Sequence, residues 1–271
     1  MIVLMRAWLG AAMLCALAVT PATAALAQAP DTVLLEELTW TEVRDAVRAG
    51  KTTIIVPAGG TEQSGPHIAL GKHNARVKIL SERIARVLGD ALVAPVIAYV
   101  PEGGLAPPTG HMRFAGTISA PEDAFEKVLE SAARSFKLHG FRRIVLLGDH
   151  GSTQAGQKAV AARLNREWAT TPARVLAIEE YYRAADVEVA QLLKARGYRD
   201  AELGRHAGLT DTALTLATAP GLVRADRLRP GREGDGVDGD PSRATAELGR
   251  AGVEVIVTRT VEAIRKSIPT R

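Results

Sequence analysis

The stretch that decides the fold reads Thr52-Thr-Ile-Ile-Val-Pro57, followed by Ala58-Gly-Gly60. This short β-branched run ends in a glycine turn, which predicts a buried strand. Residues 91–100, 143–148 and 174–178 are apolar runs of the same kind. Pro95 interrupts the first of these, and because proline cannot donate to a strand ladder, an edge position or an irregular start is expected there.

Segments with helical periodicity alternate with these runs. Apolar residues recur at helical spacing over residues 76–88 and again after Ser119-Ala-Pro-Glu122, which resembles a capping box. Further helices are predicted over residues 154–168 and 186–195. The alternation predicts βαβ units, and therefore an α/β domain with a mostly parallel sheet.

The composition is that of an ordinary globular protein. Of 271 residues, 46% are hydrophobic and 24% are charged, and the formal net charge is +4. These values exclude collagen-like and largely disordered classes. The charges are interspersed, so the sequence gives no indication of a nucleic-acid-binding surface, and we expect no nucleic-acid partner.

The first 27 residues have the features of a secretory signal peptide. Arg6 precedes an apolar run over residues 8–19, and an Ala-x-Ala site ends at Ala27. The run is short for a membrane span, although an uncleaved anchor is the alternative. We expect residues 28–271 to form one domain, exported to a periplasm or secreted and free of the membrane. Cys15, the only cysteine, would leave with the peptide, so any metal site must use His, Asp and Glu.

Ionisable residues gather where the predicted strands end, at the edge where open parallel sheets form their sites. Such an edge can bring several donors to one point, as a divalent cation requires. Imidazole and carboxylate donors suit Zn²⁺, with Mn²⁺ or Fe²⁺ as alternatives. The candidates are Glu62, His67, His73, Glu102, His111, Asp149, His150, Glu179 and Glu180, and His206 follows in a later loop.

Five ordered motifs resemble those of the creatininase (creatinine amidohydrolase) family. The first is Gly59-Gly-Thr-Glu-Gln-Ser-Gly-Pro-His-Ile-Ala-Leu-Gly-Lys-His73, and the others are residues 110–119, 148–152, 206–212 and 236–241. The resemblance covers most of the chain between residues 55 and 250. It implies a three-layer α/β/α fold, a metal-dependent hydrolase of non-peptide or cyclic C–N bonds, and a homo-oligomer, often a hexamer.

The metal ligands of that family fall here on Glu62, Ser64, His73, His150 and Ser152. The two serines are poor ligands. An imidazole at position 73 offers one lone pair to one cation, whereas the family's bridging carboxylate can serve two. We therefore predict a single divalent ion, with zinc preferred over manganese or iron, held by Glu62, His73 and His150.

The resemblance also implies roles for other residues. When bound, the ion would lower the pKa of a water molecule to about 7 and polarise an amide carbonyl. His206 is predicted to move the proton, with Asp211 orienting it or sharing the role, while His111 and Glu180 are predicted to contact the substrate. The predicted function is an exported amidohydrolase of a small, possibly cyclic, amide. The alternative is a degenerate family member that binds a small ligand or a metal without turnover.

Overall fold

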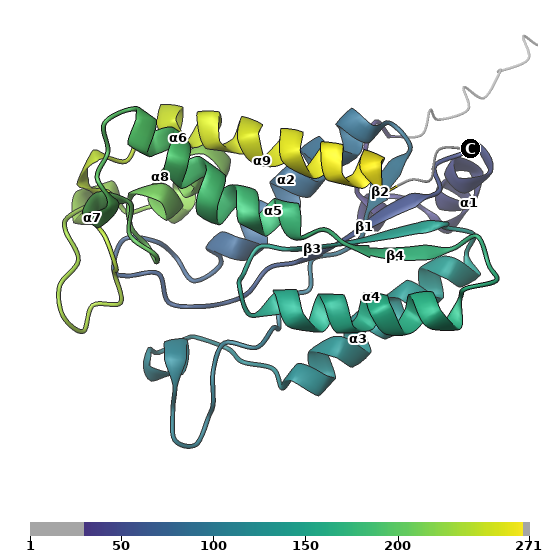
Figure 1. Cartoon of the computed structure of the whole chain (residues 1–271), viewed down its shortest axis with the longest axis horizontal. Coiled ribbons are helices and arrows are strands. Elements are labelled where there is room, and N and C mark those ends of the chain that lie inside the picture. The colour runs from purple at the N-terminus through teal and green to yellow at the C-terminus, as the bar shows by residue number, and fades with distance from the viewer. Residues whose placement is uncertain (1–29, 268–271) are drawn as a thin grey trace, which may run out of the picture. The chain divides into compact units, whose positions relative to one another are not determined.

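Four parallel strands form the central sheet, in the order β2-β1-β3-β4 (Figure 1). They are β1 (Thr53–Ala58), β2 (Ala91–Val93), β3 (Arg143–Gly148) and β4 (Arg174–Ala177). The computed structural model describes residues 30–267, so the predicted signal peptide lies outside the described residues. β1 pairs with β3 along its whole length, and all six residues of β1 are buried.

Helices connect the strands and cover the sheet. The longer ones are α1 (Trp40–Arg48), α2 (Lys72–Leu88), α3 (Glu122–Leu138), α4 (Thr153–Glu167), α8 (Leu209–Thr218) and α9 (Ala246–Lys266). The shorter helices are α5 (Glu179–Arg183), α6 (Val189–Ala195) and α7 (Asp200–Leu203), and a π-helical turn, η3 (Ala184–Glu188), joins α5 to α6. Short 3₁₀ turns are η1 (Leu35–Glu37), η2 (Gly110–Arg113), η4 (Pro220–Leu222), η5 (Ala225–Arg227) and η6 (Pro241–Arg243).

Successive residues of β1 point into two different cores. Ile55 packs in a core shared with α2, α8 and α9, whereas Ile54 and Val56 pack in a second core with α3 and α4. Figure 1 shows α9 and α5 on one side of the sheet and α3 and α4 on the other. Each fully buried aliphatic side chain contributes about 1.5–3 kcal/mol. The predicted three-layer α/β/α architecture with a parallel sheet is therefore confirmed.

Several element boundaries differ from the predictions. β2 ends at Val93, before Pro95, although the chain still runs beside β1 through a bond from the Ile97 amide to the Pro57 carbonyl. The helix predicted to begin at residue 186 instead starts at Glu179 and includes the π-helical turn η3.

The predicted capping box is wrong. α3 begins at Glu122 without a side-chain cap. Ser119 Oγ instead accepts the amides of Glu102 and Gly103, at 3.0 and 3.2 Å. The sequence pattern matches a capping box, but the Ser119 hydroxyl accepts backbone amides of the loop after β2 instead of an amide of α3.

The described residues from Asp31 onward form one compact unit. No helix within residues 30–267 is both long enough and apolar enough to cross a membrane.

Candidate metal and hydrolytic site

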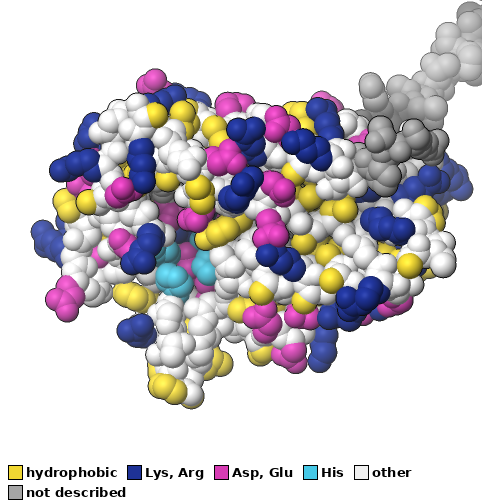
Figure 2. All heavy atoms as spheres, viewed as in Figure 1, with side chains coloured by type: hydrophobic (Ala, Val, Ile, Leu, Met, Phe, Trp, Pro, Cys, Tyr) yellow, Lys and Arg dark blue, Asp and Glu magenta, His cyan; other side chains and the backbone are white. Residues whose placement is uncertain are grey.

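The carboxyl edge of the sheet opens into a cavity of about 330 Å³. Its lining comes from residues that follow β1, β2 and β3, from the first turns of α2, from α5 and η3, and from α8 with the loop that leads into it. Figure 2 shows histidine and acidic side chains gathered in a hollow on this face. The cavity therefore lies at the carboxyl edge of the sheet, where the sequence predicted a site.

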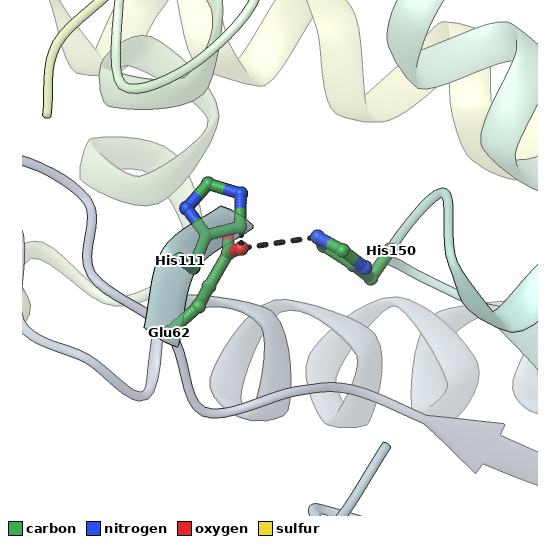
Figure 3. Close-up of side chains that lie close together, drawn as sticks. All are labelled: Glu62, His111 and His150. Carbon is green, nitrogen blue, oxygen red and sulfur yellow. Dashed lines mark ion pairs between the residues drawn. The ribbon is translucent and has the colours of Figure 1, made fainter. Parts of the chain in front are cut away.

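Three donor atoms converge in this cavity (Figure 3). Oε2 of Glu62 lies 3.1 Å from Nε2 of His111 and 3.0 Å from Nε2 of His150. All three atoms lie within 4.8 Å of one another. Two ligand atoms of a tetrahedral zinc ion stand roughly 3.3 Å apart. The spacing of Glu62, His111 and His150 is thus close to that of a metal site.

Unsatisfied oxygens mark the same place. Oε2 of Glu62 and both carboxyl oxygens of Glu102 are buried and have no hydrogen-bond partner among residues 30–267. Nε2 of His111 and Nε2 of His150 lie 3.1 and 3.0 Å from Oε2 of Glu62. Buried polar atoms are rarely left unpaired, because desolvation without a partner costs free energy. These oxygens, next to imidazole nitrogens, fit a bound cation.

The protonation states suit metal binding at Glu62 and His111. Burial by itself would raise the pKa of Glu62, but Lys72 at 3.4 Å and the imidazoles of His150 and His73 hold it well below the usual range. Burial lowers the pKa of His111, which favours the neutral ring. An ionised carboxylate and a neutral imidazole are the forms that bind a cation.

His73 bridges two carboxylates. Its Nε2 lies 2.7 Å from Oε1 of Glu62, and its Nδ1 lies 2.6 Å from Oδ2 of Asp149. Because each ring nitrogen has a carboxylate oxygen within hydrogen-bond distance, neither nitrogen is free for a cation in this arrangement. The sequence predicts His73 as the third ligand beside Glu62 and His150. The structure brings these three residues together. The third side chain of the metal-like cluster with Glu62 and His150, however, is His111 and not His73.

Two buried cations compensate Asp149 and Asp211. Lys72 Nζ lies 2.9 Å from Oδ2 of Asp211, and Arg76 Nη1 lies 3.0 Å from Oδ1 of the same residue. Arg76 Nε also lies 2.8 Å from Oδ2 of Asp149, whose Oδ1 accepts the Tyr181 hydroxyl at 2.6 Å. Burial by itself would raise the pKa of both aspartates. Arg76 holds the pKa of Asp149 below the usual range, and Lys72 together with Arg76 does the same for Asp211. Both aspartates are therefore ionised and already paired.

His206 lies in the loop before α8 and faces Glu62 in the same cavity. Its Nε2 donates to the Gln63 carbonyl at 2.9 Å, which leaves Nδ1 as the lone-pair nitrogen, 3.8 Å from Oε1 of Glu62. Burial, and then the charge of Lys72, lower the pKa of His206 to about 4. The ring is neutral at pH 7 and can accept a proton at Nδ1.

Asp211 positions His206 indirectly. Its Oδ2 accepts the amide of Ala207, at 2.9 Å. Ala207 has a φ of 55°, in the left-handed region that non-glycine residues rarely adopt. Asp211 thus holds the turn that directly follows His206, whereas no hydrogen bond joins the two side chains within the described part of the chain.

The remaining predicted residues occupy different places. Glu180 lines a separate hollow with Glu188 and Arg259, so the structure does not bring it to the cavity that contains Glu62. His67 is buried, and its Nε2 lies 3.0 Å from the Thr212 hydroxyl, which is a packing role. Of the two serines at ligand positions of the family, Ser152 contacts Nδ1 of His150 at 2.6 Å. Ser64 is fully buried.

Lys72 and Arg76 were missed in the sequence, and Glu102 was noted only as a strand-end residue. Lys72 and Arg76 stand one turn apart at the start of α2, on the buried side of the helix. A signal was present, because two cations on an otherwise apolar helix face require acidic partners. The partners Asp149 and Asp211 lie 73 and 135 residues away from Arg76, and no local pattern connects them.

Comparison with known proteins relates this site to one family. The family model described as creatinine amidohydrolase matches residues 36–264. The creatinine amidohydrolase of Pseudomonas putida is 27% identical over 257 residues, covering 88% of this chain and 98% of that protein. The mycofactocin precursor peptide peptidase of Mycobacterium tuberculosis is 28% identical over 253 residues, covering 80% of this chain and 86% of that protein.

Solved structures agree in fold. A crystal structure of creatinine amidohydrolase has a TM-score of 0.74 at 26% identity and covers 89% of this chain and all of that chain. A manganese form of creatininase has a TM-score of 0.71 at 27% identity, covering 88% of this chain and all of that chain. With the family model matched over nearly the whole described range, and with the same fold, this chain belongs to the creatininase family.

Proposed function

We propose that this chain is a metal-dependent hydrolase that cleaves the C–N bond of a small amide, cyclic amides included. The observation that carries the proposal is the convergence of Glu62 Oε2, His111 Nε2 and His150 Nε2 in the cavity, beside buried oxygens that lack partners. Relatives named for creatinine and for a precursor peptide support hydrolysis of an amide bond as the shared reaction class.

The donor set favours one divalent ion. Asp149 and Asp211 are already compensated by Arg76 and Lys72, and Oε1 of Glu62 is paired with His73. Among the carboxyl oxygens of Glu62, Asp149 and Asp211, Oε2 of Glu62 is the one left for a cation, together with the two imidazoles. Two imidazoles and a carboxylate suit zinc, with manganese and iron as alternatives. Solved creatininases include a manganese form and a Zn-Zn form.

The protein's own groups account for positioning and proton transfer. A divalent ion held by Glu62, His111 and His150 would supply a water of lowered pKa and polarise the amide carbonyl. Nδ1 of His206 faces this point and is neutral at pH 7, so His206 accepts the proton and returns it to the leaving nitrogen. Asp211 holds the turn after His206 and does not itself transfer protons, because two cations keep it ionised.

The proposal extends to where the protein acts. The signal-peptide pattern of residues 1–27 supports export to a periplasm or the exterior. Family resemblance supports a homo-oligomer. Intact mass and light scattering on protein recovered from the natural compartment would test both. A mass that includes residues 1–27, or a monomer at micromolar concentration, would contradict the corresponding part.

The central test is metal content per chain together with turnover of a panel of small amides, lactams and cyclic ureides. We expect about one ion per chain, lost in His150→Ala and His111→Ala and largely kept in His73→Ala. Loss in His73→Ala with retention in His111→Ala would instead support the ligand set predicted from sequence. A bound ion without turnover of any amide would favour a binding protein, and two ions per chain would overturn the single-ion proposal.

A further inference from the structure

Glu102 is a buried carboxyl group that lies beside Glu62 and His150 of the proposed metal site. It follows β2, its residue is 4% exposed, and neither carboxyl oxygen has a hydrogen bond within residues 30–267. Its Oε2 lies 3.3 Å from Nε2 of His150. A carboxyl group in such a place destabilises the fold unless something else satisfies it.

The surrounding chain nevertheless holds Glu102 in this position. Ser119 Oγ accepts the amides of Glu102 and Gly103, which fixes the loop after β2. Gly60 lies on the other side, where an added Cβ would stand 2.5 Å from Oε1 of Glu102. Gly60 has a φ of 146°, which favours glycine, so both backbone conformation and space are adapted to this carboxyl group.

Glu62, His111 and His150 together compensate only part of the charge of a divalent ion. One oxygen of Glu62 is paired with His73 and lies near Lys72, so Glu62 compensates only part of a divalent charge. His111 and His150 add none as neutral ligands. Glu102 is adjacent to His150. Burial and the charge of Glu62 raise the pKa of Glu102 to about 9, so it would add a negative charge at this site when a cation displaces its proton. Its distance from Nε2 of His150 also matches the roughly 3.3 Å between two ligand atoms of a tetrahedral ion.

We infer that Glu102 is a fourth protein ligand of the ion, completing the set Glu62, His111 and His150. This inference rests on the proposed function. Glu102 does not line the cavity, whereas the other three residues do. It approaches from the protein side, which leaves the cavity side of the ion for water and substrate. Neither the family's ligand positions nor the three-residue cluster includes Glu102.

The test compares Glu102→Gln with the full-length wild-type protein, using Zn²⁺ and Mn²⁺ titrated against a competing chelator. We expect Glu102→Gln to weaken binding of the ion at least about tenfold. Glu102→Asp should also weaken it, because Ser119 fixes the backbone and the side chain is one methylene shorter. Glu179→Gln is the matched control, since Glu179 also follows a strand but is exposed, and it should bind as wild type does.

A second readout separates a ligand from a packing residue. Without metal, Glu102→Gln should melt at or above the wild-type Tm, because the amide keeps the shape and removes an unpaired carboxyl group. With metal, its gain in Tm should be smaller than that of the wild type. Equal affinity in both proteins would overturn the role of Glu102 and leave the proposed function intact. Absence of binding in the wild type would instead overturn the proposed metal site itself.

Discussion

The ammonium group of Lys72 lies 2.9 Å from Oδ2 of Asp211, and the Lys72 side chain is completely buried. The same nitrogen lies 3.4 Å from Oε1 of Glu62. Lys72 therefore links the carboxylate of the proposed metal site to the aspartate that holds the His206 loop. A fixed internal cation occupies the space between these two acids.

Replacing Lys72 should destabilise the protein. Lys72→Met keeps the length of the side chain but leaves Asp211 and Glu62 with less compensation. Removing one partner of a buried ion pair costs about 3–5 kcal/mol. The free energy of unfolding from urea titration measures this loss. Lys78→Met, on the exposed side of the same helix, is the control and should lose less than about 1 kcal/mol. Equal effects in the two variants would contradict the role of Lys72.

His206→Gln should separate catalysis from metal binding. We expect kcat to fall about 10²–10⁴-fold, the usual contribution of a general acid–base group, with an unchanged number of ions per chain. Turnover of an amide substrate and elemental analysis provide the two measurements. His139→Gln, at the exposed end of α3, should change neither. If the ion were lost together with activity, His206 would be a ligand and not a proton carrier.

Ser64→Ala should leave the metal site intact. Ser64 is fully buried, and its hydroxyl has no hydrogen bond within the described range. Removing an unpaired buried hydroxyl is neutral or stabilising, so the Tm should stay or rise. Thr212→Val is the contrasting variant, since its hydroxyl contacts His67, and it should lose about 1 kcal/mol. A clear drop in ions per chain in Ser64→Ala would show that the serine is a ligand.

Glu202 should make stability depend on pH in the acid range. The Arg199 amide, with the side chains of Arg199 and Arg243, lowers its pKa from 4.5 to about 2. A carboxyl group whose pKa is lower in the folded state stabilises the protein above its unfolded pKa. That contribution is lost as the pH falls from about 4.5 toward 2.

The Tm of the wild type should therefore exceed that of Glu202→Gln by the largest amount at pH 6, and this difference should shrink below pH 4.5. Thermal melts from pH 3 to pH 7 measure it. Glu233→Gln, in an exposed loop, should follow the wild type at every pH. A difference that does not change with pH would mean that the Glu202 contacts do not depend on its charge.

The sequence by itself determined the layers and the edge that carries the site. Alternating β-branched runs and amphipathic helices produce a parallel sheet with two apolar faces, since each element must bury its apolar side. In such a sheet the strand ends share one edge, which is why Glu62, His111 and His150 could be expected together, whereas the role of His206 was implied by the family resemblance. Local patterns also predicted Pro95 as an interruption of its strand.

Only the tertiary structure decided how these side chains pair. The Ser119 hydroxyl was expected to cap a helix but instead fixes the Glu102 loop, because acceptors and donors far apart in sequence compete for it. His73 differs from His111 through contact with Asp149, 76 residues away. Lys72 and Asp211 pair across 139 residues. Which nitrogen is free for a cation depends on these long-range contacts, and periodicity and spacing in the chain carry no information about them.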